Sequence, residues 1–175
     1  MNKAASISII VPVLNEAAQL PGSLASIGAL DGSVQLIVVD GGSTDDSLAV
    51  ARRCGAETLV SPIRQRAAQM NLGAESAAGD VLLFLHADTR LPANWRGILA
   101  SEMQRDAACV GGAFRRRFDF RRLSSTLRAG WRTGAARNSV GFSATKPCSC
   151  GGMFFARLAA SPRFRSARTW ISPFV

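Results

Sequence analysis

The sequence predicts one α/β domain: a mostly parallel, Rossmann-like sheet flanked by helices, followed by an irregular C-terminal tail. Short apolar runs alternate with helical stretches over the first 119 residues, and two of these runs end in acidic loops. After Trp131 the alternation is lost. Alternating strands and helices with short links are typical of a parallel sheet with right-handed crossovers. We therefore expect a domain over residues 1–131 and an irregular basic tail over residues 132–175.

Apolar runs, turn residues and helix caps predict the individual elements. The β-branched run at residues 7–14 is typical of a strand buried on both faces. Pro21 disturbs the start of the following helix, Asp45 is an N-cap candidate for the next one, and Gly55 has the position of its C-cap. The expected elements are strands at 7–14, 34–39, 58–61, 81–85 and 109–114, and helices at 15–28, 45–54, 64–78 and from Pro92; Gly79 is expected to close the third helix.

Charge is unevenly distributed along the chain. The 175 residues carry a net charge of +9. Residues 1–119 hold 11 Lys and Arg and all 12 Asp and Glu, whereas residues 120–175 hold 10 Lys and Arg and no carboxylate. About a quarter of the residues in soluble domains are charged, with both signs present. The acid-free segment therefore either binds polyanions or does not have the amino-acid sequence on which natural selection acted.

Composition also restricts the class of protein. At 47% hydrophobic residues the chain is able to form a core. Its longest apolar run, Ile7 to Leu14, is too short to span a bilayer, and no signal peptide is visible. The four cysteines are typical of reduced thiols, and Cys148 and Cys150 have the wrong spacing for a zinc knuckle. We expect a cytoplasmic protein.

Acidic loops follow the second and the fourth strand. The two runs are Val38-Val39-Asp40-Gly41-Gly42-Ser43-Thr44-Asp45 and Leu83-Phe84-Leu85-His86-Ala87-Asp88-Thr89. In open α/β sheets, ligands bind outside the carboxyl ends of the strands. There Asp40 can accept hydrogen bonds from a base or a ribose, Gly41 and Gly42 allow close approach, and Asp88 can bind Mg²⁺ or Mn²⁺ beside a diphosphate.

Each of these residues has a structural alternative. Asp40 alone is as typical of a helix-capping turn as of a ligand, and Asp45 and Asp46 are more typical of caps. Arg66 and Asn71 begin the helix before the fourth strand and could reach the same edge, but Arg66 alone is typical of an exposed helix face. Their combination is more specific than any one of them.

The combination resembles the family 2 glycosyltransferases with a GT-A fold. Four segments carry the resemblance, and order, spacing and content agree over residues 6–120. Within the family the chain looks most like a bacterial subgroup labelled for arsenosugar biosynthesis. The segments are Ser8-Ile9-Ile10-Val11-Pro12-Val13-Leu14-Asn15-Glu16, the turn from Asp40 to Asp45, Arg66-Ala67-Ala68-Gln69-Met70-Asn71-Leu72-Gly73-Ala74 and Phe84-Leu85-His86-Ala87-Asp88-Thr89.

The resemblance implies a UDP- or GDP-sugar donor, a divalent cation, and inverting transfer to an unknown acceptor. Asp88 would be the metal-linked carboxylate. In the Asp-Asp-Gly-Ser turn common in the family, Gly41 stands for the second carboxylate, and His86 stands for the first Asp of the metal motif. Mg²⁺ prefers oxygen, so His86 is expected in the pocket rather than on the metal. The candidate nucleotide-sugar site is Pro12, Leu14, Glu16, Asp40, Gly42, Arg66, Asn71, His86, Ala87 and Asp88.

The catalytic base is not found in the sequence. An inverting transferase needs a base to deprotonate the acceptor, and the family places an Asp or Glu after the metal loop. No carboxylate follows Asp119. One hypothesis is a frame slip near residues 133–143. Shifting the reading frame back by one nucleotide permits a segment with a Glu-Asp pair. In that frame the codons of Met153 and Phe154 necessarily give a Val, and those of Trp170 and Ile171 necessarily give an Asp. The other hypothesis is a genuine basic arm that could hold anionic lipid at a membrane surface or nucleic acid; it ranks below the frame slip, because its charges are scattered and aromatic stacking residues are few.

Other classes of function remain as alternatives. The missing base favours a donor-binding remnant without turnover. A nucleotidyltransferase on a similar sheet would need a Gly-rich basic loop after the first strand, and Pro12-Val13-Leu14-Asn15-Glu16 is not one. Nucleic-acid binding ranks last, because residues 1–119 are slightly acidic and aromatic stacking residues are few.

Overall fold

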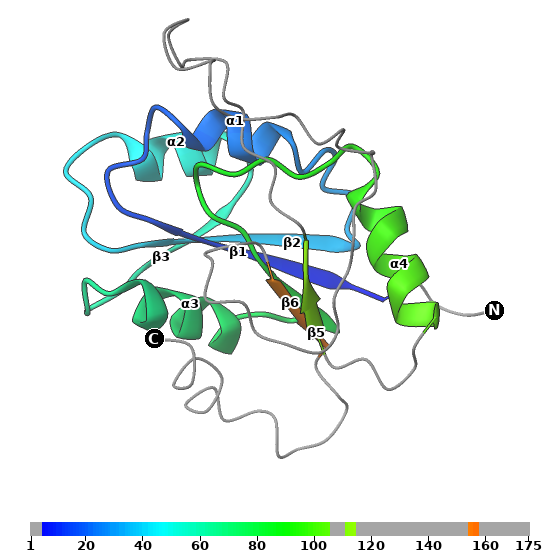
Figure 1. Cartoon of the computed structure of the whole chain (residues 1–175). Coiled ribbons are helices and arrows are strands. Elements are labelled where there is room, and N and C mark those ends of the chain that lie inside the picture. Colours follow the sequence, from blue (N-terminus) through cyan, green and yellow to red (C-terminus); the bar gives the residue numbers. More distant parts are fainter. Residues whose placement is uncertain (1–4, 106–110, 115–153, 158–175) are drawn as a thin grey trace, which may run out of the picture.

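The computed structural model describes residues 5–105, 111–114 and 154–157. Within these ranges one six-stranded sheet has the order β3-β2-β1-β4-β6-β5 (Figure 1). Strands β1 to β4 are parallel, and β6 pairs antiparallel with β4 and with β5. The strands are β1 (Ile7–Val13), β2 (Val34–Asp40), β3 (Glu57–Val60), β4 (Val81–Phe84), β5 (Gly111–Ala113) and β6 (Phe154–Arg157), and the helices are α1 (Leu20–Ala25), α2 (Ser47–Arg53), α3 (Arg66–Glu75) and α4 (Trp95–Arg105).

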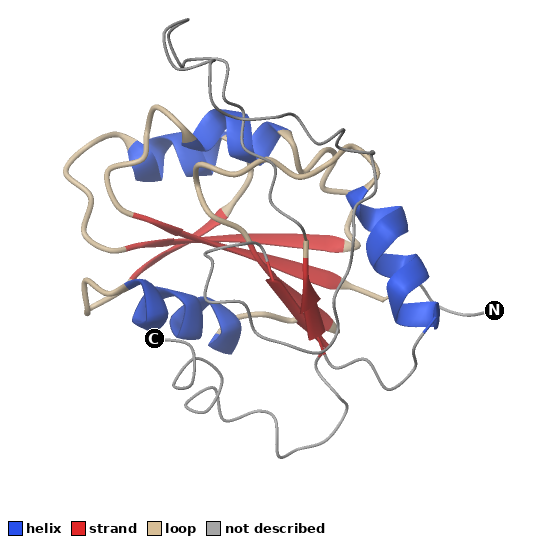
Figure 2. Cartoon of the chain, in the orientation of Figure 1, coloured by secondary structure: helices blue, strands red, loops and turns tan. Residues whose placement is uncertain are grey.

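Helices cover both faces of the sheet (Figure 2). Side chains alternate along each strand, so each strand contributes to both helix layers. On one face Ile9, Leu36 and Leu83 lie in a large core with residues of α1, α2 and α4. On the other face Ile10 and Val39 pack against Met70 of α3. The predicted α/β sheet, buried on both faces, is confirmed.

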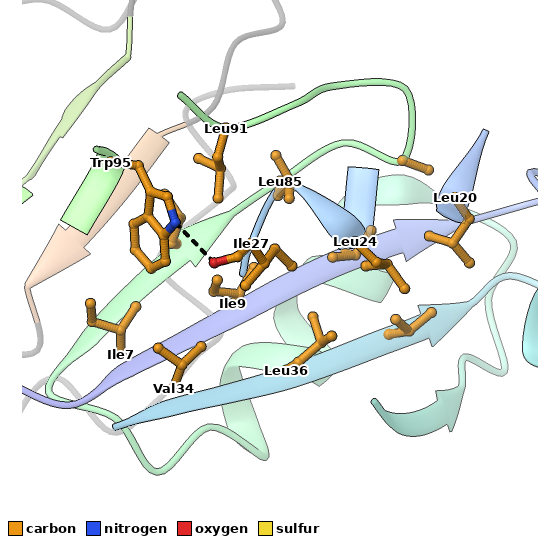
Figure 3. Packing of buried hydrophobic residues seen from close by; sticks show 14 of the residues in the cluster. Ile7, Ile9, Leu20, Leu24, Ile27, Val34, Leu36, Leu85, Leu91 and Trp95 are labelled. Carbon is orange, nitrogen blue, oxygen red and sulfur yellow. Dashed lines mark hydrogen bonds between the residues drawn. The ribbon is translucent and has the colours of Figure 1, made fainter. Parts of the chain in front are cut away.

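Residues from the end of α1 and the start of α4 pack together in the larger core (Figure 3). Trp95 at the start of α4 is 2% exposed and packs with Leu91 and Ile7. Its indole N–H donates a hydrogen bond to the backbone carbonyl of Ile27, 3.2 Å away. A buried indole needs such an acceptor, so this bond sets the position of α4 relative to the end of α1.

The helices are shorter than the sequence pattern predicts: α2 covers Ser47–Arg53 within the expected 45–54, α4 begins at Trp95 rather than Pro92, and α1 and α3 differ as follows. Helix α1 begins at Leu20 rather than Asn15, because Asn15 adopts a positive φ of 55° and a turn follows it. Pro21 lies in the first turn of α1, where its missing N–H costs no hydrogen bond. Helix α3 ends at Glu75, and Gly79 does not close it. A Cβ on Gly79 would lie 2.6 Å from the backbone nitrogen of Ser8, so this glycine permits close approach of the chain to β1.

Strand β6 comes from the segment in which the sequence pattern indicated no regular structure. Its register places Phe154 opposite Phe84 and Arg157 opposite Val81. Strand β5 (Gly111–Ala113) is the expected fifth strand, and residues 109 and 110 of the predicted range lie outside the described residues. The predicted division of the chain at residue 131 stays a prediction. Among the described residues, no helix is both long enough and apolar enough to cross a membrane.

Candidate nucleotide-sugar site

The loops after β1 and β2 are joined to each other at the carboxyl ends of these strands, on the left of Figure 1. Asn15 donates its backbone N–H to the Ser43 hydroxyl at 2.9 Å and accepts the Thr44 N–H on its side-chain oxygen at 2.8 Å. Glu16 donates its N–H to the Ser47 hydroxyl at 2.9 Å. These bonds connect residues about 30 positions apart, so the two loops form one surface.

Asp40 lies at this edge, but its carboxylate faces its own turn. The side chain is 2% exposed. Its Oδ2 accepts the N–H groups of Gly42 and Ser43, each at 2.9 Å, and its Oδ1 accepts the Ser43 hydroxyl. Both carboxylate oxygens are therefore used by the turn. The geometry supports the turn-forming role of Asp40 that the sequence left open beside the ligand role.

The two glycines of the turn have different tasks. Gly42 has a φ of +91°, a conformation that L side chains rarely adopt, and no atom of the described residues lies within 4 Å of the position of an added Cβ. Gly42 is exposed, so a ligand can approach its backbone. Gly41 is buried, and a Cβ there would lie 3.1 to 3.2 Å from the side-chain amide of Gln69.

The loop after β4 is held by serines of α1. Ser23, 1% exposed, donates its hydroxyl to the carbonyls of Thr89 at 2.7 Å and His86 at 3.2 Å. Just after α1, the Ser26 hydroxyl accepts the N–H of Leu91 at 2.9 Å. This support leaves Asp88 exposed to solvent, with one oxygen accepting the Thr89 hydroxyl at 2.9 Å.

A polar cavity of about 210 Å³ lies between α1 and this loop, lined by Ala18, Gln19, Gly22, Ser23, Asp88 and Arg90. The guanidinium of Arg90 lies over Gly22, since a Cβ there would be 2.8 Å from an Arg90 nitrogen. The sequence analysis missed Arg90 and Gln19. Arg90 stands two residues after Asp88, a spacing that could have indicated a cation beside the carboxylate.

The other predicted residues are distributed as follows. Pro12 is buried within β1, Leu14 and Glu16 are half-buried in the joined loops, and the side chain of Ala87 packs into the larger core. His86 is half-buried. Arg66 is exposed at the start of α3. Asn71 is half-buried on α3, and its Oδ1 is buried without a hydrogen-bond partner among the residues that the structure describes. The structure therefore joins the loops after β1 and β2, and α1 holds the loop after β4.

Asp45 belongs to the same hydrogen-bond network. Helix α2 begins after Asp46, whose side chain makes no capping bond. Asp45 accepts the N–H and the hydroxyl of Ser47 and the N–H of Ala17. The hydrogen bond from the Ser47 hydroxyl, and to a smaller extent the one from the Ala17 N–H, holds the pKa of Asp45 below its ordinary value of 3.8. The prediction of Asp45 as the N-cap is wrong by one residue, because Asp46 is the N-cap, although the side chain of Asp45 accepts the N–H at the start of α2.

The residues present fit a hydrated divalent cation. Within the described residues no three His, Cys, Asp or Glu side chains form a cluster that could hold a metal by themselves. Mg²⁺ usually takes one or two carboxylates and completes its shell with waters and substrate phosphates. Asp88 provides one exposed carboxylate of this kind.

The fold and the polar edge of the sheet define the class of this protein: an α/β protein of the GT-A type. The chain belongs to glycosyl transferase family 2, whose sequence model matches residues 8–162. The predicted family is confirmed, while its arsenosugar subgroup stays a prediction.

Two proteins with similar sequences are also named glycosyltransferases. An uncharacterized glycosyltransferase of Mycobacterium tuberculosis is 33% identical over 107 residues, which are 61% of this chain and 48% of that protein. A PGL/p-HBAD biosynthesis glycosyltransferase of Mycobacterium bovis is 41% identical over 91 residues, covering 48% of this chain and 36% of that protein. The chain thus spans about half or less of the length of these relatives.

Solved structures with the same fold contain nucleotides and Mn²⁺. Glucosyl-3-phosphoglycerate synthase from M. tuberculosis, in complex with Mn²⁺, UDP and phosphoglyceric acid, is 26% identical with a TM-score of 0.53, over 61% of this chain and 42% of that chain. A mannosyltransferase from Pyrobaculum calidifontis, in complex with GDP-Man and Mn²⁺, is 23% identical with a TM-score of 0.58, over 66% and 37%. The latter likeness supports the fold.

Proposed function

We propose that this chain binds a UDP- or GDP-sugar at the carboxyl edge of the sheet and belongs to an enzyme that transfers the sugar to an acceptor with inversion. One observation carries the proposal: the exposed carboxylate of Asp88 lines a cavity together with Arg90 at the end of β4. A carboxylate for a cation and a guanidinium for a phosphate are the two groups that a diphosphate needs. The UDP and Mn²⁺ complex of the 26% identical synthase agrees with this assignment.

Individual roles follow from the geometry of the site. Asp88 would hold Mg²⁺ or Mn²⁺, which stabilises charge on a departing diphosphate. Arg90 would contact a phosphate oxygen, since its guanidinium lines the cavity beside Asp88. The joined loops after β1 and β2, with Leu14, Glu16 and Gly42, would hold the nucleoside. Asp40 would support these loops from within, because both of its oxygens are used by the turn.

Arg66 and Asn71, which both lie on α3, are also assigned to the proposed nucleotide-sugar site. The Oδ1 of Asn71 is a buried acceptor that receives no hydrogen bond from any residue in the described part of the chain. Leaving such an atom unpaired costs about 1–3 kcal/mol, so a donor group of a ligand would be favoured there. Pro12, His86 and Ala87 would shape the pocket through their backbones and their packing.

Transfer by this particular chain is expected to be weak or absent. No Asp or Glu occurs in residues 120–175, where the family resemblance places the acceptor-side base. The second candidate function is therefore nucleotide-sugar binding without turnover. Contact of residues 132–175 with anionic lipid is the alternative that would apply if this segment were a genuine basic arm.

We further propose that the acid-free segment arises from a frame slip near residues 133–143. Shifting the frame permits, for one choice of codons, a segment with the Glu-Asp pair that the sequence lacks. Against this proposal stands the match of the family model, which runs to residue 162. Sequencing the gene decides: an error-free locus without a homologous segment in the alternative frame would refute the slip. A restored frame should raise transfer activity.

Calorimetric titration with UDP and with GDP, with and without Mn²⁺, tests the donor site. We expect Mn²⁺-dependent binding that Asp88→Asn weakens strongly, because the amide loses the negative charge but keeps the shape. Asp46→Asn is the matched control, since Asp46 is an exposed carboxylate whose side chain makes no capping bond. Lack of binding by the folded wild-type protein would contradict the proposal, as would equal binding by Asp88→Asn.

A further inference from the structure

We propose that Gln69 is a positioning residue that holds the ends of β1 and β2 in the arrangement needed to bind the nucleotide. The inference rests on the proposed function and adds a residue to it. Gln69 lies on α3, is 4% exposed, and belongs to none of the loops that form the site. It would act through the two strand ends and not by touching the ligand.

The side-chain amide of Gln69 bridges the two strands at their carboxyl ends. Its Nε2 donates to the carbonyl of Val13 and to the carbonyl of Val39, both at 2.8 Å. Val13 is the last residue of β1, and Val39 is the penultimate residue of β2. The Val13 carbonyl also accepts the N–H of Gly41 at 2.9 Å. One amide therefore satisfies both of its donors and fixes two backbone segments at once.

The contact with Gly41 explains a departure from the family pattern. Any side chain at position 41 would begin 3.1 to 3.2 Å from the Gln69 amide, closer than most real contacts of a Cβ. The carboxylate that the common Asp-Asp-Gly-Ser turn has at this place would press on that amide. Gly41 and Gln69 thus form a matched pair, in which the glycine leaves room for the glutamine beneath the turn.

Helix α3 gives Gln69 a rigid support. The backbone N–H of Gln69 donates to the carbonyl of Gln65 at 3.0 Å, and the adjacent Met70 packs with Ile10 and Val39 in the smaller core. The chain continues from Val13 into Asn15, and from Val39 into the Asp40 turn, where the joined loops begin. A shift of either strand end would move the surface to which the nucleoside is assigned, and misplacement by about 1 Å is enough to impair such sites.

Gln69→Met tests the inference, because methionine keeps the length of the side chain and removes both donors. Gln35→Met is the matched control. Gln35 lies on β2 near the amino ends of the strands, where its Oε1 accepts the Ser8 hydroxyl at 2.7 Å and the Ala78 N–H at 2.9 Å. The affinity for UDP and GDP with Mn²⁺ is measured by calorimetry well below the melting temperature of each variant, together with amide hydrogen exchange.

We expect both variants to melt at lower temperatures, and only Gln69→Met to raise the nucleotide dissociation constant, by about tenfold or more, as expected when buried acceptors lose their donors. The backbone amide hydrogen of Gly41 should exchange faster than in the wild type in Gln69→Met and at the wild-type rate in Gln35→Met. Should Gln69→Met fail to fold, Gly41→Ala displaces the same amide more gently, and an affinity equal to that of the wild type would then overturn the positioning role. Where Gln69→Met does fold, the effect of Gly41→Ala on affinity should be smaller in that background than in the wild type, as for two residues acting through one contact.

The outcomes separate the two claims. Binding by the wild type and equally by Gln69→Met would overturn the positioning role and leave the proposed function intact. Equal loss of affinity in Gln35→Met would also overturn the positioning role, since general destabilisation would then explain both variants. Absence of nucleotide binding in the wild type would refute the proposed function, and the inference with it.

Discussion

Asp45 accepts a hydrogen bond from the backbone N–H of Ala17, with 3.0 Å between the oxygen and the nitrogen. The bond joins the loop after β1 to the turn before α2, across 28 positions of sequence. Asp45 also accepts the N–H of Ser47 at 3.0 Å. A single exposed carboxylate thus connects a helix start with a loop of the proposed nucleotide site.

Replacing Asp45 by alanine should lower both the melting temperature and the affinity for nucleotide, because the loop after β1 loses an anchor. Asp46→Ala is the control, since Asp46 is the adjacent carboxylate and makes no capping bond. Thermal melting and calorimetric titration of the two variants provide the comparison. Equal effects of both substitutions would show that net charge, and not the Ala17 contact, is responsible.

Acidification should weaken the attachment of α4 through Asp31. Hydrogen bonds from Ser33 and Arg96 lower the pKa of Asp31 from 3.8 to about 2. A carboxylate with a lowered pKa in the folded state stabilises the fold above its unfolded pKa and loses this effect as the pH falls toward 2. Urea unfolding should therefore show a difference between wild type and Asp31→Asn near neutral pH that shrinks between pH 4 and pH 2. A constant difference would contradict this assignment.

Trp95→Phe should destabilise the protein by about 1–3 kcal/mol, because the Ile27 carbonyl loses its donor and a smaller ring leaves space in the core. Nucleotide affinity should not change, since Trp95 lies in the larger core and lines no part of the proposed site. Chemical denaturation and calorimetry are the two measurements. A stability equal to that of the wild type would mean that the indole hydrogen bond contributes nothing.

Two glycine substitutions should have opposite effects on stability. Gly79→Ala should destabilise the protein by about 1–3 kcal/mol, since its Cβ would overlap backbone atoms of β1. Gly97→Ala should stabilise it by up to about 1 kcal/mol, because Gly97 lies in α4 with no atom within 4 Å of an added Cβ. The free energies of unfolding in urea measure both. Destabilisation by Gly97→Ala would indicate that α4 is held differently.

The sequence predicted the elements well where the signal was local. The apolar runs of β1, β2 and β4 and the turn at Gly55, which has a φ of +78°, are found where composition placed them. Helix ends were less accurate. The sequence pattern does not show that Asn15 takes a positive φ, because this conformation is held by bonds to Ser43 and Thr44 on another loop.

The structure shows where the candidate residues lie, while their roles in binding stay predictions. That Asp88 would follow β4 at the carboxyl edge could be read from a strand pattern and a loop. That Arg90 lines the same cavity depends on the packing of the loop against Gly22 of α1, which no local pattern shows.

By itself, the sequence determined the parallel α/β sheet, the carboxyl edge at which its two acidic loops lie and the family, because strand periodicity and turn residues act over a few neighbouring positions. Only the tertiary structure decided that Asp40 faces its own turn and that Gln69 bridges β1 and β2. The direction of a polar side chain depends on which donors and acceptors surround it, and those of Gln69 come from strands 30 and 56 positions away.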